Sequence, residues 1–460
     1  LGIPKTLRST LDVSGFLRQG GVLAPRRRKE FLEAGKQSFR AMFSEEAALD
    51  IDAGMRADPV LDLLTDVNRK VKLSITDISK KGIRGLDARE EQFASKMLNR
   101  MGKLSIPIRA SERHYVTFLN NFRYRIAKNT LINWQKAGIE VTDEMIDGMN
   151  GWINASTGRT ELVPKKITWK DREIHLAGPL NVVFWSPQLV ISRFETLGKY
   201  ATAMGKLGLD RTGAIHLDPA ARLISQEIAK DMTAFVATGI TLVSMAALAA
   251  KAAPGVFEDM SVERDPRSSD FGKMRIGATR IDPWAGFQPV ARYIAQGMTG
   301  QRKTISTGEI SPTDRKAGKD AGWPIRPIVG ADDTIGRFLR SKLAPGISTM
   351  IAAEVASKTF TGDKLNDEQP LFAAGASTFL PDVTVDVRTA QLIEQFVPLI
   401  LMDFDEAIAE QGLAGGFLAA APALVGIGSQ TFGRRRGQAP AGFSFAHQMA
   451  VEPQPRPERP

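Results

Sequence analysis

The residues in this chain that are best suited to chemistry are arginines and lysines interleaved with aromatic side chains. They are concentrated between residues 100 and 128, and a second basic run lies at residues 26–29. Arginine binds phosphate through paired N–H donors, and aromatic faces can stack on nucleic-acid bases. We therefore predict weak, non-specific and salt-dependent DNA binding. The candidate residues are Arg26, Arg27, Arg28, Lys29, Arg100, Lys103, Arg109, Arg113, Arg123, Arg125 and Lys128.

An alternative interpretation of the same stretch needs no nucleic acid. Phe118 and Phe122 share the apolar stripe of a helix expected over residues 110–136, which is typical of core residues. The basic side chains would then form only the solvated outer face of that helix. The chain has 61 Lys and Arg against 51 Asp and Glu, a formal net charge of +10. That excess fits either a polyanionic partner or a soluble basic protein without one.

Known catalytic and metal-binding patterns are absent from the sequence. There is no Cys, and the four His are widely separated and share no ligand spacing. No P-loop, no His-Glu-x-x-His and no Gly-x-Ser-x-Gly occurs. The carboxylate pairs Asp332 with Asp333 and Asp403 with Asp405 are of a kind more typical of solvated faces and helix caps. We predict no enzymatic activity, no metal and no cofactor.

Two long uncharged runs, Met232–Ala250 and Gln411–Gly433, raise the question of a membrane. The first is just long enough to cross a bilayer as a helix, and Arg434–Arg436 follow the second. A buried central helix is the favoured interpretation of Met232–Ala250, because the run is rich in Ala and Thr and its apolarity is modest. The candidate membrane-contact residues are Phe235, Val236, Ile240, Leu242, Val243, Met245, Leu248, Phe417, Leu418, Leu424 and Val425.

The block that begins at Asp265 is the most distinctive stretch of the sequence. Its residues are Asp265, Pro266, Arg267, Ser268, Ser269, Asp270, Phe271 and Gly272, followed by Asp282, Pro283 and Trp284. This block resembles one found in very large tailed-phage proteins, the polyvalent-protein-associated and internal virion group. Residues 184–193 and 12–20 resemble the same group. The resemblance implies a protein that is packaged in the virion and delivered with the genome, and it supplies no catalytic residues.

The elements that would position these residues are mainly α-helices. We predict an elongated multi-helix architecture with a small hairpin near 265–281 and a disordered Pro-rich tail. Asp58-Pro59, Asp218-Pro219 and Asp282-Pro283 should each begin a helix, because Asp caps a helix and Pro fits its first turn. A loop or small hairpin is expected within residues 151–179.

The expected domain organisation has five parts. Residues 1–150 form a basic helical domain, and residues 151–300 form a helical domain that contains the apolar helix and the Asp265 block. Residues 301–333 form a polar connector, 334–433 a C-terminal helical domain, and 434–460 the tail. Because the chain begins with Leu, it is also expected to be a processed piece of a longer polypeptide.

Together these observations lead to the hypothesis of a phage internal virion, or ejection, protein without catalytic activity. It would lie inside the virion and, after ejection, in the host envelope. There it would assist DNA passage as a homo-oligomeric conduit or scaffold. Its expected partners are phage DNA, the host membrane and other internal virion, portal or tail proteins. The alternatives are a soluble DNA-escort domain of a large polyvalent protein, or a fragment of a parent chain whose enzymatic module, for example a peptidoglycan-cleaving one, lies elsewhere.

Overall fold

The computed structural model describes residues 15–77, 105–160, 186–252 and 260–313, except 278, 306 and 307. It also describes short pieces between residues 162 and 184 and between residues 338 and 431. The described part is mainly α-helical, as the sequence predicts. The predicted Pro-rich tail, Arg100 and Lys103 lie outside the described residues, and so do Phe417, Leu418, Leu424 and Val425.

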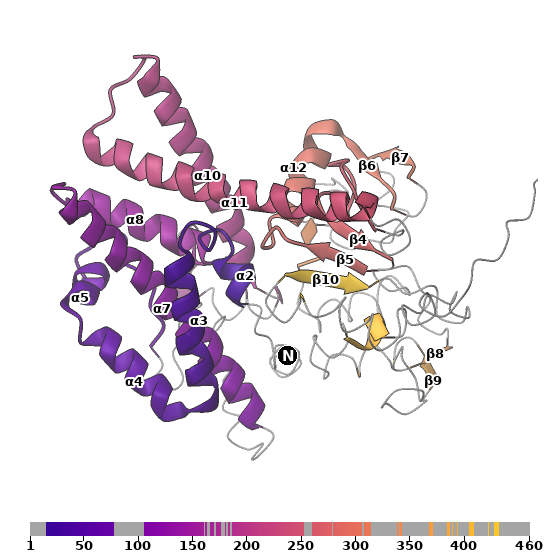
Figure 1. Ribbon diagram of the computed structural model, residues 1–460, viewed down its shortest axis with the longest axis horizontal. Helices are drawn as coiled ribbons and strands as arrows, with labels where there is room; N and C mark the ends of the chain where they lie inside the picture. Colours follow the sequence, from indigo (N-terminus) through magenta and orange to yellow (C-terminus); the bar gives the residue numbers. More distant parts are fainter. Residues whose placement is uncertain are drawn as a thin grey trace, which may run out of the picture.

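The N-terminal helices pack around one long helix, α7, which is drawn in purple in Figure 1. Aromatic side chains fill the contacts of α7 with α3 and α2. The rings of Phe31 on α3 and Phe122 lie 5.6 Å apart, and those of Phe16 on α2 and Phe118 lie 4.4 Å apart. Phe118 and Phe122 are therefore core residues. The helices are α2 (Gly15–Gly20), α3 (Arg28–Phe43), α4 (Glu45–Arg56), α5 (Pro59–Thr65), α7 (Ser105–Lys136) and α8 (Asp143–Ser156).

Local capping explains where several helices begin. The Asp58 carboxylate accepts a hydrogen bond from the Val60 amide at 2.9 Å, and Pro59 occupies the first turn of α5. Asp218 accepts one from the Ala221 amide at 2.8 Å at the start of α11 (Pro219–Ala252). Each carboxylate satisfies a backbone donor that the helix leaves free. Both predicted helix starts are confirmed.

A pair of long helices, α10 (Pro187–Arg211) and α11, links the N-terminal helices to a sheet. α11 is the long horizontal helix in Figure 1: its first half packs beside α8 and α10, and it then crosses the sheet. The sheet has the order β10-β5-β4-β3 and is antiparallel throughout. Its strands are β3 (Met260–Val262), β4 (Met274–Ile276), β5 (Thr279–Asp282) and β10 (Gly428–Thr431).

The predicted hairpin near 265–281 is confirmed, with its strands at β4 and β5. The prediction that a helix begins at Asp282-Pro283 is wrong, because the helix here, α12, spans Gln288–Thr299. Asp282 ends β5, and its carboxylate accepts a hydrogen bond from the Trp284 amide at 2.9 Å. Ala285 and Gly286 then adopt positive φ angles of 52° and 82°, which a right-handed helix does not allow.

Smaller hairpins complete the described structure. β1 (Lys166–Trp169) pairs with β2 (Arg172–His175), which confirms a hairpin within residues 151–179. β6 (Gln301–Lys303) pairs with β7 (Ile310–Pro312) inside the predicted polar connector, and β8 (Glu368–Pro370) pairs with β9 (Thr384–Asp386).

Part of the second uncharged run belongs to the sheet. β10 lies within Gln411–Gly433 and is hydrogen-bonded to β5, so this part of the run is a strand of the sheet. The same pairing joins the predicted C-terminal domain to the domain of the Asp265 block. The boundary expected at residue 150 falls inside α8.

Candidate functional site

The second half of α11 carries apolar side chains on its surface, and this feature defines the candidate site. Among the described helices, α11 is long and apolar enough to cross a membrane, yet only 22% of its most apolar stretch is buried. Its exposed large side chains range from 37% to 64% exposure. We call them the α11 apolar face; they are Val236, Ile240, Leu242, Met245 and Leu248.

The interpretation of Met232–Ala250 as a buried central helix therefore holds only for its beginning. Met232 and Phe235 are buried, and the Phe235 ring lies 5.6 Å from that of Phe287 and 6.2 Å from that of Trp284. Phe235 is thus a core residue and not a membrane contact in this conformation. Val243 is half-buried. From Val236 onward the helix exposes apolar surface that has no cover among the described residues.

The start of this helix is held by a cluster of ion pairs. Arg26 contacts Glu227 at 2.7 Å and Asp231 at 2.8 Å, and Arg27 contacts Glu227 at 2.9 Å. Trp152 of α8 donates its indole N–H to the other oxygen of Asp231 at 3.0 Å. These contacts fix the first half of α11 to the N-terminal helices. Two candidate phosphate-binding residues, Arg26 and Arg27, are thereby engaged with carboxylates of the chain itself.

The other basic candidates on α7 are also engaged within the protein. Arg113 donates to the carbonyls of Ala41 and Met42 at the end of α3, at 3.0 and 2.9 Å. Lys128 pairs with Asp58, and Arg125 hydrogen-bonds to Asn121 on its own helix. Arg109 is half-buried near Glu112.

Arg123 is fully buried, which contradicts its assignment as a DNA contact. Its guanidinium donates to the Thr157 hydroxyl at 2.8 Å, to the Thr157 carbonyl at 3.0 Å and to the Ser74 carbonyl at 3.1 Å. Basic residues of a helix are normally placed on its solvated face, and this expectation fails here because α7 is surrounded by other helices. Of the described candidates, Arg28 and Lys29 are exposed.

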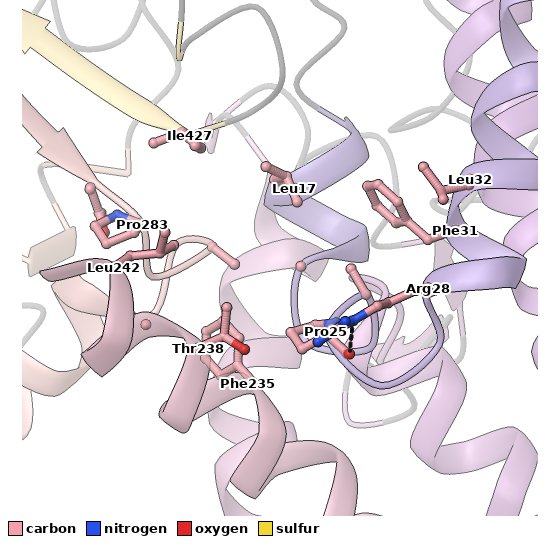
Figure 2. A pocket seen from close by; sticks show the side chains of 15 residues that line it. Leu17, Pro25, Arg28, Phe31, Leu32, Phe235, Thr238, Leu242, Pro283 and Ile427 are labelled. Carbon is pink, nitrogen blue, oxygen red and sulfur yellow. Dashed lines mark hydrogen bonds between the residues drawn. The ribbon is translucent and has the colours of Figure 1, made fainter. Parts of the chain in front are cut away.

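Next to the α11 apolar face lies a cavity of about 360 Å³, which we call the junction pocket. Leu17, Phe31 and Leu32 line it from the N-terminal helices, and Leu242 and Pro283 lie on its other side, as Figure 2 shows. Its walls are almost wholly apolar. Leu242 belongs both to the pocket and to the α11 apolar face, so the two features are continuous.

Arg193 holds together the segments that form the pocket. This fully buried side chain donates to the Ala285 carbonyl at 3.1 Å, to the Ser156 carbonyl at 3.2 Å and to the Arg18 carbonyl. Its guanidinium also lies 4.8 Å from the centre of the Phe287 ring. Burial lowers the pKa of Arg193 to about 9. One side chain thus ties α2, α8 and the loop before α12 together.

The Asp265 block braces the sheet. Asp270 accepts from Arg280 of β5 at 2.8 Å and pairs with Lys273 at 3.2 Å. Gln288, the first residue of α12, donates to the Ser269 carbonyl at 2.8 Å, and Trp284 donates to the Gly272 carbonyl at 2.8 Å. These contacts give the block a structural role, because they dock the helix that follows it.

Three polar side chains, Arg28, Thr238 and Asp282, interrupt the apolar lining of the junction pocket, and two of them carry ionisable groups. Asp282 lies beside Pro283, and burial raises the pKa of its carboxyl group. Arg28 is the first residue of α3; its Nε donates to the Pro25 carbonyl at 3.0 Å, the dashed line in Figure 2. Sequence reasoning identified Leu242, Asp282 and Arg28 separately. It missed their juxtaposition, because that depends on contacts between segments about 200 residues apart, such as Arg27 with Glu227.

Comparison with protein-family models, with curated proteins and with solved structures gave no match. The functional argument therefore depends on the chain's own surface. That surface offers an exposed apolar helix face beside an apolar pocket, with Arg28 at the pocket's edge. Such an arrangement suits contact with lipid, because apolar side chains enter the acyl region while cationic ones meet phosphate.

Proposed function

We propose that this protein binds a lipid bilayer through the α11 apolar face and has no catalytic role. Given its resemblance to internal virion proteins, we propose that it acts as a phage ejection protein. In that role it would be delivered with the genome and would assist DNA passage across the host envelope as a homo-oligomer. Its expected partners are phage DNA, the host membrane and other virion proteins.

The observation that carries the proposal is the exposure of the α11 apolar face. Met245 and Leu248 are 61% and 64% exposed, although each would contribute about 1.5–3 kcal/mol if buried. Exposed apolar surface concentrated on one helix marks an interaction site. This part of α11 also contacts β3 of the sheet, so the helix would lie along the membrane interface, with its exposed apolar side chains in the acyl region.

Charge at the end of α11 fits the same geometry. Lys251 is exposed just beyond the α11 apolar face. A lysine at this place can bury its aliphatic stem and still hold its ammonium group at the level of the lipid phosphates. Asp231 lies on the other side of the apolar run, where its carboxylate is satisfied by Arg26 and Trp152 instead of solvent. No unpaired carboxylate therefore has to enter the membrane at that end.

The proposal is tested by vesicle flotation with the double variant Leu242→Asp and Met245→Asp. Both side chains are exposed, so the variant is expected to fold like the wild type. The substitutions remove two apolar contacts with the acyl region, each worth about 1.5–3 kcal/mol, and we expect binding to vesicles to fall at least about tenfold. The matched control is Met204→Asp with Leu209→Asp, two exposed residues of the same types on α10.

Equal flotation of the α11 double variant and the wild type, with both folded by circular dichroism, would contradict the membrane role. Salt-dependent DNA binding without flotation would favour the DNA-escort alternative. Proteomic analysis of purified virions tests the biological setting, because absence of the chain from particles would remove the ejection role. A native product longer than this chain and carrying a peptidoglycan-cleaving module would favour the fragment alternative.

A further inference from the structure

We propose that the junction pocket takes one acyl chain of an anionic phospholipid, with the lipid phosphate bound by Arg28. The inference depends on the proposed membrane role, because the lipid would come from the bilayer that α11 contacts. Leu242 lines the pocket and belongs to the α11 apolar face. An acyl chain could therefore leave the bilayer and enter the pocket without crossing a polar surface.

The size and the lining of the pocket favour a long apolar ligand. Its volume of about 360 Å³ lies within the range of roughly 300–1,000 Å³ that is usual for ligand sites. Leu17, Phe31, Leu32 and Leu242 provide apolar walls, and Figure 2 shows them around the open space. A polar ligand would lose its hydrogen bonds to water there and regain few. An acyl chain loses none.

Only three polar side chains reach this pocket among the residues described as lining it. The carboxylate of Asp282 already accepts a hydrogen bond from the Trp284 amide. Thr238 lies on α11 and is exposed at the pocket's edge. Arg28 is therefore the group best placed to select the charge of the ligand's polar end.

Arg28 differs from the two arginines before it in what its guanidinium contacts. Arg26 and Arg27 form ion pairs with Glu227, whereas the Nε of Arg28 donates to the Pro25 carbonyl. Within the described part of the chain, no other hydrogen bond or ion pair of Arg28 occurs, and the residue is exposed. Paired guanidinium donors match two phosphate oxygens. Lys29 is exposed beside it and adds a second positive charge.

The test measures binding of monomeric dioctanoyl-phosphatidylglycerol to the full chain by isothermal titration calorimetry. We expect saturable binding of one lipid per chain. Thr238→Trp places an indole at the pocket and should abolish it, whereas Thr233→Trp should leave it unchanged. Thr233 is an exposed threonine on the same helix that does not line the pocket. Trp at an exposed position should leave the fold intact in both variants.

Arg28→Gln tests the phosphate contact, with Arg40→Gln as its matched control. Both arginines are exposed residues of α3, but Arg40 lies away from the pocket and hydrogen-bonds to Gln37. We expect Arg28→Gln to weaken phosphatidylglycerol binding about fivefold and Arg40→Gln to leave it unchanged. Dioctanoyl-phosphatidylcholine has the same phosphate but no net charge, so it should bind the wild type more weakly than phosphatidylglycerol does.

Two outcomes would overturn the inference while leaving the membrane role intact. One is a wild type that floats with phosphatidylglycerol vesicles but shows no saturable binding of the short-chain lipid. The other is a Thr238→Trp variant that binds the lipid as well as Thr233→Trp does. An unchanged affinity in Arg28→Gln would overturn the phosphate contact. Binding of the short-chain lipid without flotation would reject the bilayer as its source and the proposed function with it.

Discussion

Trp284 lies against Gly239 of α11 so closely that any side chain at position 239 would collide with the indole. A Cβ placed on Gly239 would come within 2.4 Å of Cζ3 and 2.7 Å of Cη2 of the ring. The indole N–H is held at the same time by the Gly272 carbonyl at 2.8 Å. This contact fastens the middle of α11 to the loop that follows β5, at the point where the α11 apolar face begins.

Gly239→Ala should therefore destabilise the protein. The indole is held by its hydrogen bond and cannot move aside without cost, so we expect a loss of about 1–3 kcal/mol in the free energy of unfolding. The control is Gly205→Ala on α10, where a new Cβ meets no atom within 4 Å. It should stabilise by about 0.4–1 kcal/mol. Equal urea midpoints for the two variants would contradict the contact.

Asp231→Asn should loosen the attachment of α11 to the N-terminal helices. The substitution leaves Arg26 and Arg27 with Glu227 as their remaining partner in the cluster, and removing one member of a buried ion pair costs about 3 kcal/mol. Asp50→Asn, an exposed position on α4, should change stability by less than about 0.5 kcal/mol. Chemical denaturation measures both. Similar stabilities of the two variants would show that the cluster does not hold α11.

Two arginines on α7 should behave differently when replaced by glutamine. Arg123→Gln removes a buried guanidinium that donates hydrogen bonds to the Thr157 hydroxyl and to the carbonyls of Thr157 and Ser74. We expect a loss of about 3 kcal/mol in the free energy of unfolding. Arg125→Gln breaks a contact within the helix and should cost less than about 0.5 kcal/mol. Differential scanning calorimetry compares them. If Arg123→Gln is as stable as Arg125→Gln, the buried network does not stabilise the protein.

Because of Glu112, the free energy of unfolding should decrease as the pH rises from about 4.5 to about 7. Burial raises the pKa of this carboxyl to about 7, despite the neighbouring Arg109 and Arg113, from a reference value of 4.5. Between those pH values the folded chain binds more protons than the unfolded chain, so stability decreases toward pH 7. Glu112→Gln should remove this dependence, with a gain on the order of 1–3 kcal/mol at pH 8 and little change at pH 4.5.

The control for that prediction is Glu33→Gln, an exposed position on α3. It should leave the pH profile of thermal unfolding as it is in the wild type. A Glu112→Gln profile that overlays the wild-type profile would mean that Glu112 has the same pKa in the folded and the unfolded chain, which would contradict the prediction.

Local signals in the sequence predicted much of the fold. Asp58 with Pro59 and Asp218 with Pro219 each begin a helix, because a cap acts on amides within three residues of itself. The apolar stripe that contains Phe118 and Phe122 predicted α7 and its buried face. These elements depend on neighbours along the chain, which a single sequence displays.

Features that depend on distant contacts were not predictable in this way. Asp282-Pro283 has the residues of a helix start, but docking of Trp284 on Gly239 and the turn at Ala285 delay the helix until Gln288. The positive charge of Arg123 suggested a solvated or phosphate-binding residue, but helix packing buries its side chain. The junction pocket likewise forms only when α3, α11 and the loop after β5 meet.

The central claim is that the α11 apolar face enters the lipid phase, and site-specific fluorescence at Met245 tests it most directly. The chain contains no Cys, so Met245→Cys can carry a single environment-sensitive nitrobenzoxadiazole label. Met204→Cys, at another exposed methionine on α10, is the control. With phosphatidylglycerol vesicles, we predict a blue shift and quenching by nitroxide-labelled lipid at position 245 but not at 204. An unchanged spectrum at position 245 with vesicles in excess would contradict the account.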